Sequence, residues 1–371
     1  QVPVGMFLDR FGSRVMLTAG SLTMGAGQVL LGLAADLPQA YVARILLGIG
    51  DAAIFGSVLR LLPRWFDARR VPMLSQITAV FAAVGQIGSV VVVLPLIHLT
   101  GWQNGLVLTA CASFIAAALA LLLVRNTPPG EAKATASDPI REIPATLVRV
   151  TKHPATQLGF WVHFTCGFSF NAFVFMWGMP FLLVTQDLSR LEASGLFTAL
   201  SVAAMTAGPV IGALTARHPL RRSDMALLVT IGLILCWSAV LLWPGRAPGG
   251  LLIALVIMLA VSAPSTGIGF DFPRTSLPYR RLGAANGIVI AGGFTGGTVL
   301  ILLMGVVLDG IASGQPYTAD QLRLAWALQA PFFVLGILGI LSSRRRLRRR
   351  MAADGVIVPS WREVAERLRR T

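Results

Sequence analysis

Long apolar runs recur along the 371-residue chain, and they limit its fold more than any other feature. Several runs reach 18 residues or more, the length that a helix needs to cross the apolar core of a bilayer. Only 13% of the residues are charged, about half the share of a soluble domain, so water cannot be the only solvent. The runs are rich in Leu, Ala, Val and Gly without alternation, which favours helices over a barrel. The sequence therefore predicts an all-α polytopic membrane protein.

We predict ten complete membrane-spanning helices after a helical stub at residues 1–8. The predicted spans are 15–35, 40–62, 72–97, 103–124, 157–184, 192–216, 224–243, 249–271, 284–308 and 323–342. A long polar segment with several prolines predicts a linker, with a short amphipathic helix around Pro144–Lys152. The chain then divides into an N-terminal bundle (1–124), a cytoplasmic linker (125–156), a C-terminal bundle (157–343) and a basic cytoplasmic tail (344–371).

The net charge of +15 is concentrated in connections that alternate along the chain. Basic loops gather on the cytoplasmic side of a membrane, so this placement predicts a cytoplasmic C-terminus and argues against a nucleic-acid partner. The tail after Arg344 is predicted to lie near anionic lipid headgroups, with Trp361, Val364 and Leu368 on one helical face. The basic connections carry Arg10 and Arg14; Arg64, Arg69 and Arg70; Arg217, Arg221 and Arg222; and Arg274, Arg280 and Arg281.

The chain contains an internal repeat. Residues 69–85 and 280–296 align without gaps, with two arginines before a helix and a glycine at matching depth. Residues 5–14 align with residues 212–221 at nearly the same offset. Two parallel copies of one helical unit are a transporter architecture.

The stretch GMFLDRFGSR, Gly5 to Arg14, resembles the signature loop of the major facilitator superfamily, Gly-x-x-x-Asp-Arg-x-Gly-x-Arg between the second and third membrane helices. Residues 43–53, ARILLGIGDAA, resemble the arginine–glycine motif of the family's fourth helix. The resemblance implies the major facilitator fold, two six-helix bundles related as parallel repeats. It also implies an N-terminally truncated piece that lacks the first helix, which lines the substrate path in this family, and most of the second.

The resemblance further implies that the signature loop latches the cytoplasmic side shut in the outward-facing state. Asp9 can accept charge-assisted hydrogen bonds from arginines or from a helix N-terminus across the boundary between the halves. The second copy has Ala216 in place of Asp9, which makes any latch asymmetric. A plain topogenic charge cluster is the alternative. The predicted latch residues are Gly5, Asp9, Arg10, Gly12 and Arg14.

Two ionisable residues, Arg44 and Asp51, lie seven positions apart inside one apolar span and share a helical face. Ionisable residues at membrane depth are candidate functional groups. Arg44 can hold an anionic substrate group, and Asp51 can carry a proton. The alternatives are that Arg44 reaches the outer interface and that Asp51 pairs with Arg44 or with a preceding helix. No family role carries over to Asp51, because the motif has a small residue there.

A second polar cluster lies in the span 157–184, which the resemblance makes a cavity-lining helix. His163, Asn171 and Trp177 share or border one face. Taken singly, each is better explained as a packing group or an interfacial anchor; together they form a candidate part of the substrate and proton path.

The predicted function is secondary active transport of a small organic solute by alternating access, coupled to protons. Arg44 favours an anionic solute. The motifs of enzymes and nucleotide-binding sites are absent from the sequence, so we expect neither catalysis nor a cofactor or metal. A monomer in the bacterial cytoplasmic membrane is expected. One alternative is a drug efflux antiporter, which is disfavoured because the span 72–97 lacks the Gly-Pro pair that the resemblance implies for the family's drug antiporters. The other is a non-transporting receptor or a defective fragment.

Overall fold

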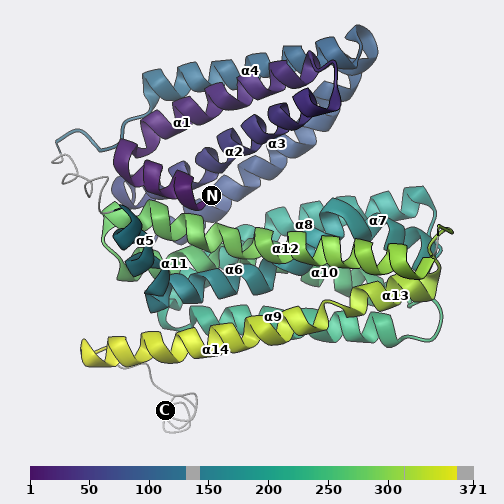
Figure 1. Ribbon diagram of the computed structural model, residues 1–371. Coiled ribbons are helices and arrows are strands. Elements are labelled where there is room, and N and C mark those ends of the chain that lie inside the picture. The colour runs from purple at the N-terminus through teal and green to yellow at the C-terminus, as the bar shows by residue number, and fades with distance from the viewer. Residues whose placement is uncertain (131–142, 313, 357–371) are drawn as a thin grey trace, which may run out of the picture.

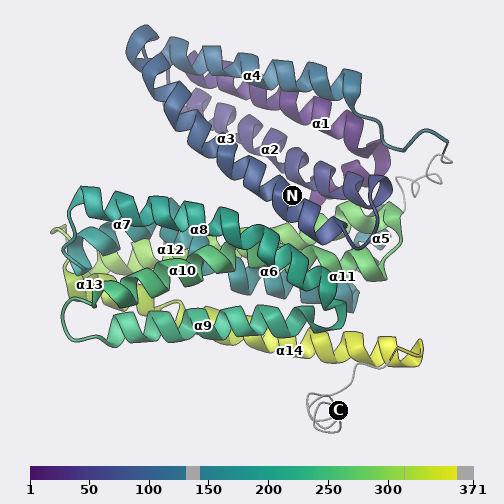
Figure 2. The ribbon, with the colours of Figure 1, turned by 180° about the vertical axis from the view of Figure 1, so that it is seen from behind.

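A computed structural model describes residues 1–130, 143–312 and 314–356, and most of them are helical. Figures 1 and 2 show two layers of helices that approach one another at the end where the short linker helix lies. We call these layers the N-half and the C-half. The N-half contains α1 (Val2–Gly32), α2 (Leu37–Trp65), α3 (Val71–Thr100) and α4 (Trp102–Leu123).

The C-half follows the linker helix α5 (Ile143–Lys152). Its first long helix, α6 (Pro154–Ala172), continues through two wide π-helical turns and the short α7 (Gly178–Pro180) to Thr185. The remaining helices are α8 (Arg190–Arg217), α9 (Arg222–Leu242), α10 (Gly249–Ser265), α11 (Ile268–Ser276), α12 (Leu282–Ala312), α13 (Ala319–Ala327) and α14 (Ala330–Ala353).

Each of the ten predicted spans overlaps one long helix or a run of consecutive helical segments, with ends that differ by up to a few residues. Over the described residues, nine helical segments are long and apolar enough to cross a membrane. The tenth span corresponds to α3, a helix of 30 residues. The predicted linker helix is also present as α5, and its buried Val150 packs against the start of α12.

Two predicted boundaries are wrong. The stub at 1–8 and the first span form one kinked helix, because only Gly12 leaves helical geometry, with φ 78° and ψ 168°. Most of the predicted signature loop is therefore helical. At the other end, α14 does not stop before the basic tail but continues through Arg344 to Ala353. The predicted helical face of Trp361, Val364 and Leu368 lies outside the residues that the structure describes.

Glycines set the close packing of α6 against α12. A Cβ atom on Gly292 would lie 2.5 Å from the carbonyl oxygen of Phe160, and one on Gly296 would lie 2.7 Å from the Phe164 ring. Small residues at such contacts let the backbones of membrane helices approach closely. The result is a rigid helix pair in the centre of the C-half.

Replacing Gly292 with alanine is expected to lower the thermal stability of the purified chain. The added methyl group meets backbone at 2.5 Å, and overpacking of this kind costs about 1–3 kcal/mol. Gly310→Ala on the same helix is the matched control, because nothing lies within 4 Å of a Cβ there. A melting curve of each variant checks the prediction; equal melting temperatures would contradict it.

Candidate functional site

The two halves meet at a capped helix N-terminus. The carboxylate of Asp9 on α1 accepts hydrogen bonds from the backbone N–H groups of Gly283 and Ala284, both at 2.8 Å, at the start of α12. The guanidinium of Arg60 on α2 lies 3.3 Å from the same carboxylate. Both charged side chains are almost enclosed, at 11% and 5% exposure. We call the contact of Asp9, Arg60, Gly283 and Ala284 the Asp9 cap.

The Asp9 cap can form because the backbones of α1 and α12 approach closely at this point. Gly5 packs directly against the backbone of Gly283, so that a side chain at either position would collide with the opposite helix. The ring of Tyr279 adds a second layer, with the guanidinium carbons of Arg60 and Arg64 at 4.4 and 4.5 Å from its centroid. Cations over an aromatic face attract it electrostatically. The contact therefore combines hydrogen bonds, an ion pair and stacking across the boundary.

The repeat-related contact on the other side of the boundary has no such cap. Gly212 on α8 packs against Met73 and Pro72 at the start of α3, as Gly5 packs against Gly283. In the repeat alignment Pro72 replaces Gly283 and Ala216 replaces Asp9, so both the N–H donor and the carboxylate are missing. The second copy therefore lacks both the acceptor and one of the two donors of the Asp9 cap.

Three of the predicted latch residues make their contacts inside the N-half. The side chain of Arg14 donates from Nε to the carbonyl of Leu121 at 2.8 Å, and its backbone N–H donates to Asn126 at 2.9 Å. Gly12 provides the turn that brings this segment against Asn126. Arg10 lies over the Phe11 ring at 5.7 Å. These residues hold the loop in shape, while Gly5 and Asp9 reach the C-half.

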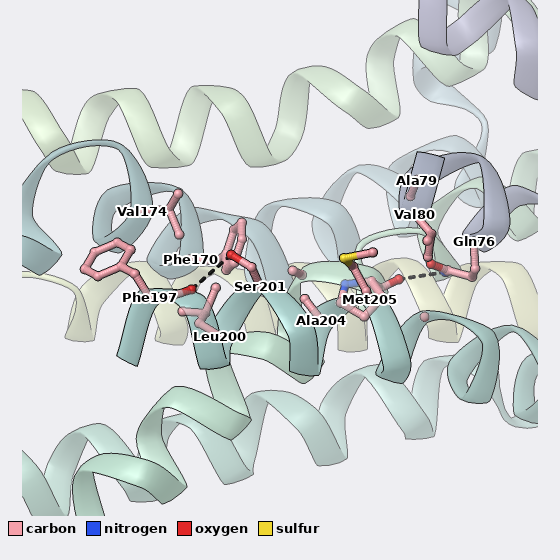
Figure 3. Close-up of a pocket in the computed structure, with 13 residues that line it drawn as sticks. Gln76, Ala79, Val80, Phe170, Val174, Phe197, Leu200, Ser201, Ala204 and Met205 are labelled. Atoms are coloured by element: carbon pink, nitrogen blue, oxygen red, sulfur yellow. Dashed lines mark hydrogen bonds between the residues drawn. The ribbon is translucent and has the colours of Figure 1, made fainter. Parts of the chain in front are cut away.

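A cavity of about 380 Å³ lies between the halves, and Figure 3 shows its walls. One wall comes from α3 and the others from α6, η2 (Phe173–Trp177), α8 and α10. Gln76 on α3 donates a hydrogen bond at 2.8 Å to the carbonyl of Pro264 on α10, which joins the halves at one edge of the cavity. The lining residues are Gln76, Ala79, Val80, Phe170, Val174, Phe197, Leu200, Ser201, Ala204, Met205, Gly208, Ala263 and Pro264.

The chemistry of this lining is neutral. Gln76 and Ser201 supply its polar side chains, and Phe170 and Phe197 supply aromatic faces. Such a surface suits the apolar body of an organic molecule with one or two hydrogen-bonding groups. Sequence reasoning missed these residues, because apolar and aromatic positions in a membrane helix look alike whether they face a cavity or a neighbour. Gln76 carried the one available signal, an amide inside an apolar run.

Arg44 and Asp51 both lie exposed on α2 and are not lining residues of the cavity. The alternative in which Asp51 pairs with Arg44 is not seen, and neither side chain has a hydrogen bond or ion pair within the described part of the chain. Phe55, one turn beyond Asp51, contacts Phe270 of the C-half with ring centroids 6.0 Å apart. By helix geometry Asp51 lies about 6 Å along the axis from this contact between the halves.

His163, Asn171 and Trp177 do share a face of the helix, and that face packs on α12. The backbone N–H of Gly293 donates to Nδ1 of His163 at 3.1 Å, and Asn171 donates to the carbonyl of the same residue at 3.1 Å. The indole N–H of Trp177 donates to the carbonyl of Ile301 at 3.1 Å. The cavity is instead lined by their neighbours Phe170 and Val174. Each of the three therefore has a packing role in this conformation.

Comparison with known proteins identifies the family. Residues 1–299 match the family model described as Major Facilitator Superfamily, so the chain belongs to that superfamily of membrane transporters. The fucose:proton symporter FucP of E. coli has the same fold, with a TM-score of 0.63 at 16% identity over 91% of this chain and 86% of that one.

Curated relatives fall into partial and nearly full-length matches. A protein named as a tartrate transporter of Agrobacterium vitis is 26% identical over 137 residues, 34% of this chain and 30% of that relative. A quinolone resistance transporter of Acinetobacter baumannii is 31% identical over 109 residues, 28% of this chain and 25% of that relative. The metabolite transport protein NicT of Pseudomonas putida is 26% identical over 93% of this chain and 82% of its own length. The matched region thus spans less than a third of the first two relatives.

Removing the carboxylate of Asp9 is expected to loosen the contact between the halves. Hydrogen bonds to a charged group contribute about 1.5–3 kcal/mol each. Asp9→Ala should therefore lower the ratio of molecules whose halves are in contact at this end to molecules whose halves are apart by about tenfold or more. Spin labels at Phe7 and Ser276, exposed residues of opposite halves, would report longer and broader distances. Asp67→Ala removes an exposed acid whose partner Arg70 lies 4.0 Å away and is the control. An unchanged distance distribution in Asp9→Ala would refute the prediction.

Proposed function

We propose that the protein acts as a secondary transporter that moves a small organic solute by alternating access. The observation that carries this proposal is the cavity of about 380 Å³ between the halves, with α3 on one side and α8 on the other. Transporters built from two parallel repeats bind substrate at the repeat interface and rock one repeat against the other. The protein's membership of a transporter superfamily supports the same function.

In this proposal the Asp9 cap acts as the latch on one side of the cavity. Opening that side separates Asp9 from the first turn of α12 and breaks the bond between Gln76 and Pro264. Substrate in the cavity lies against both α3 and α8, so it can favour one arrangement of the halves over the other. The positive-inside rule assigns the latch side, where Arg60 and Arg64 lie, to the cytoplasm.

We propose a carboxylate-bearing solute and proton coupling through Asp51. The name of the tartrate transporter relative supports the anionic class. The cavity lining is neutral, so the exposed Arg44 is the candidate for the counter-charge. Asp51 has no partner among the described residues and can exchange its proton with a path between the halves. We place the protein, as a monomer, in a bacterial cytoplasmic membrane with its C-terminus inside the cell.

A second candidate is efflux of aromatic drugs by the same fold. Phe170, Phe197 and Met205 give the cavity an apolar, aromatic surface that does not require a charged substrate. The quinolone resistance transporter among the relatives supports this class. A small hydrophilic organic acid and a large aromatic drug differ in size and hydrophobicity, so one substrate panel separates the two candidates.

The decisive experiment is transport into vesicles reconstituted with the protein and filled with a pH-sensitive dye. The panel contains tartrate, sulfoacetate, a sugar and a fluoroquinolone. A proton flux that requires tartrate or sulfoacetate supports the proposal, and one that requires the fluoroquinolone supports efflux. Binding of a compound without movement of that compound or of protons supports a receptor and would contradict the transport proposal.

Asp51→Asn is expected to abolish substrate-dependent proton flux while leaving substrate binding within about twofold. An amide cannot carry the proton, but it keeps the size and polarity of the side chain. Asp36→Asn, at the N-cap of the same helix and outside the apolar run, is the control. Full proton-driven accumulation by Asp51→Asn would remove this residue from the mechanism.

Filling the cavity is expected to block transport without unfolding the protein. Ala204→Trp places an indole among the lining residues of α8. It should reduce the transport rate at least about tenfold, because the indole occupies the volume that the substrate needs. Val202→Trp, two positions away on the same helix, is the control, since Val202 is 54% exposed and is not a lining residue. Equal rates for the two variants would place the substrate path elsewhere.

A further inference from the structure

A cluster of arginines surrounds one carboxylate at the basic end of the C-half. Asp224, in the first turn of α9, lies 2.6 Å from Arg344, 3.4 Å from Arg221 and 3.7 Å from Arg348. The four side chains are between 15% and 30% exposed. One carboxylate neutralises one guanidinium, so the cluster keeps an excess of two positive charges. We call Arg221, Asp224, Arg344 and Arg348 the Asp224 cluster.

A polar cavity of about 500 Å³ opens on one side of the Asp224 cluster. It lies between the first residues of α6 and α9, the end of α11 and the basic part of α14. Both Arg344 and Arg348 line it, together with hydroxyl groups of three other residues. Guanidinium and hydroxyl groups are the donors that bind phosphate oxygens. The polar lining residues are His153, Arg222, Ser223, Thr275, Ser276, Arg344, Arg348, Arg350 and Asp354.

Positive charge also exceeds negative charge around this cavity. Arg222 and Arg274 share Asp271, at 3.3 and 2.5 Å. Burial, and then the charges of Arg350 and Arg281, lower the pKa of His153 at the edge of the cavity. Burial disfavours charge of either sign, so only the nearby charges of Arg350 and Arg281 favour an anion here.

A second, apolar groove of about 470 Å³ shares Arg221 and Asp224 with the same cluster. Arg221 and Asp224 stand at its start, and Leu227, Leu228 and Ile231 continue it along the outer face of α9. Leu228 is 72% exposed and Ile231 is 50% exposed. Ten helical residues rise about 15 Å, so the groove leads from the arginines well into the apolar length of the helix.

We propose that the Asp224 cluster and the adjoining groove form a binding site for an anionic phospholipid. The lipid phosphate lies against Arg344 and Arg348, and an acyl chain follows the groove along α9. The site is separate from the cavity between the halves and does not depend on which solute is carried. A soluble phosphate would use the arginines but would leave the groove empty, and so the combination of the two surfaces selects a lipid.

The arginines of α14 supply a matched pair of variants. Arg344→Gln with Arg348→Gln removes two charges from the cluster. Arg345→Gln with Arg349→Gln removes the same two charges, with the same spacing, from positions that are exposed and line neither cavity. Non-specific attraction to an anionic membrane depends on charge alone and would respond equally to both pairs.

The test is native mass spectrometry of the purified chain with phosphatidylglycerol or phosphatidylcholine added to the detergent. We expect retention of at least one phosphatidylglycerol, preferred over phosphatidylcholine. The Arg344→Gln/Arg348→Gln variant should lose that preference about tenfold or more, since each arginine near an anionic lipid contributes about fivefold. The Arg345→Gln/Arg349→Gln variant should keep it. Equal loss in both variants would overturn the proposal.

A groove variant keeps the test informative if the cluster variant fails to fold. Leu228→Trp changes an exposed apolar side chain and leaves every arginine in place, and it should lower phosphatidylglycerol retention by filling the groove. Inorganic phosphate at the same concentration as the lipid should not displace it. Displacement by phosphate, with unchanged retention in Leu228→Trp, would assign the arginines to a free anion and overturn the lipid site.

Discussion

The contact between Asp9 and the start of α12 is the interaction on which the arrangement of the two halves depends. The first N–H groups of a helix have no partner within it, and burial at a domain boundary makes an unpaired donor costly. Asp9 satisfies the N–H groups of Gly283 and Ala284, and Arg60 balances its charge. The halves thus gain a strong bond only when they close at this end. Because water can replace Asp9 once the end opens, the same contact can be made and broken in each cycle.

Within the C-half, polar side chains of the apolar helices hold α6 and α12 together, whereas the Asp9 cap joins the two halves. The peptide group of Gly293 is held on both sides, by His163 at its N–H and by Asn171 at its carbonyl. Neither bond crosses the boundary between the halves. The close approach that Gly292 and Gly296 permit makes α6 and α12 one body. A rigid pair of this kind transmits a movement at the start of α12 along the whole helix.

The sequence predicts what depends on periodicity and charge, and fails where a contact partner decides the outcome. Apolar length predicted the ten spans, and the repeat predicted that the segments after Arg69 and Arg280 occupy equivalent places. The continuation of α14 past Arg344 was missed, because a run of arginines alone predicts a solvated tail. The structure shows that Asp224 lies beside Arg344 and Arg348 and pairs with them. The cavity residues were missed for a related reason. Phe170 and Trp177 lie on one helix with similar chemistry, and only the position of α12 separates the cavity face from the packed face.

A network of ion pairs in the C-half connects the cavity beside Arg222 to the boundary between the halves. Arg222 lines the polar cavity and pairs with Asp271, which also holds Arg274. Arg274 donates in turn to the carbonyl of Ala68 in the N-half, at 3.3 Å. A ligand shifts an equilibrium only by the difference between its affinities for the two states. An anion bound beside Arg222 would compete with Asp271 for that guanidinium, and we expect Asp271 then to interact more strongly with Arg274. The carboxylate of Asp271 therefore contacts both the cavity-lining Arg222 and the Arg274 side chain that reaches the N-half.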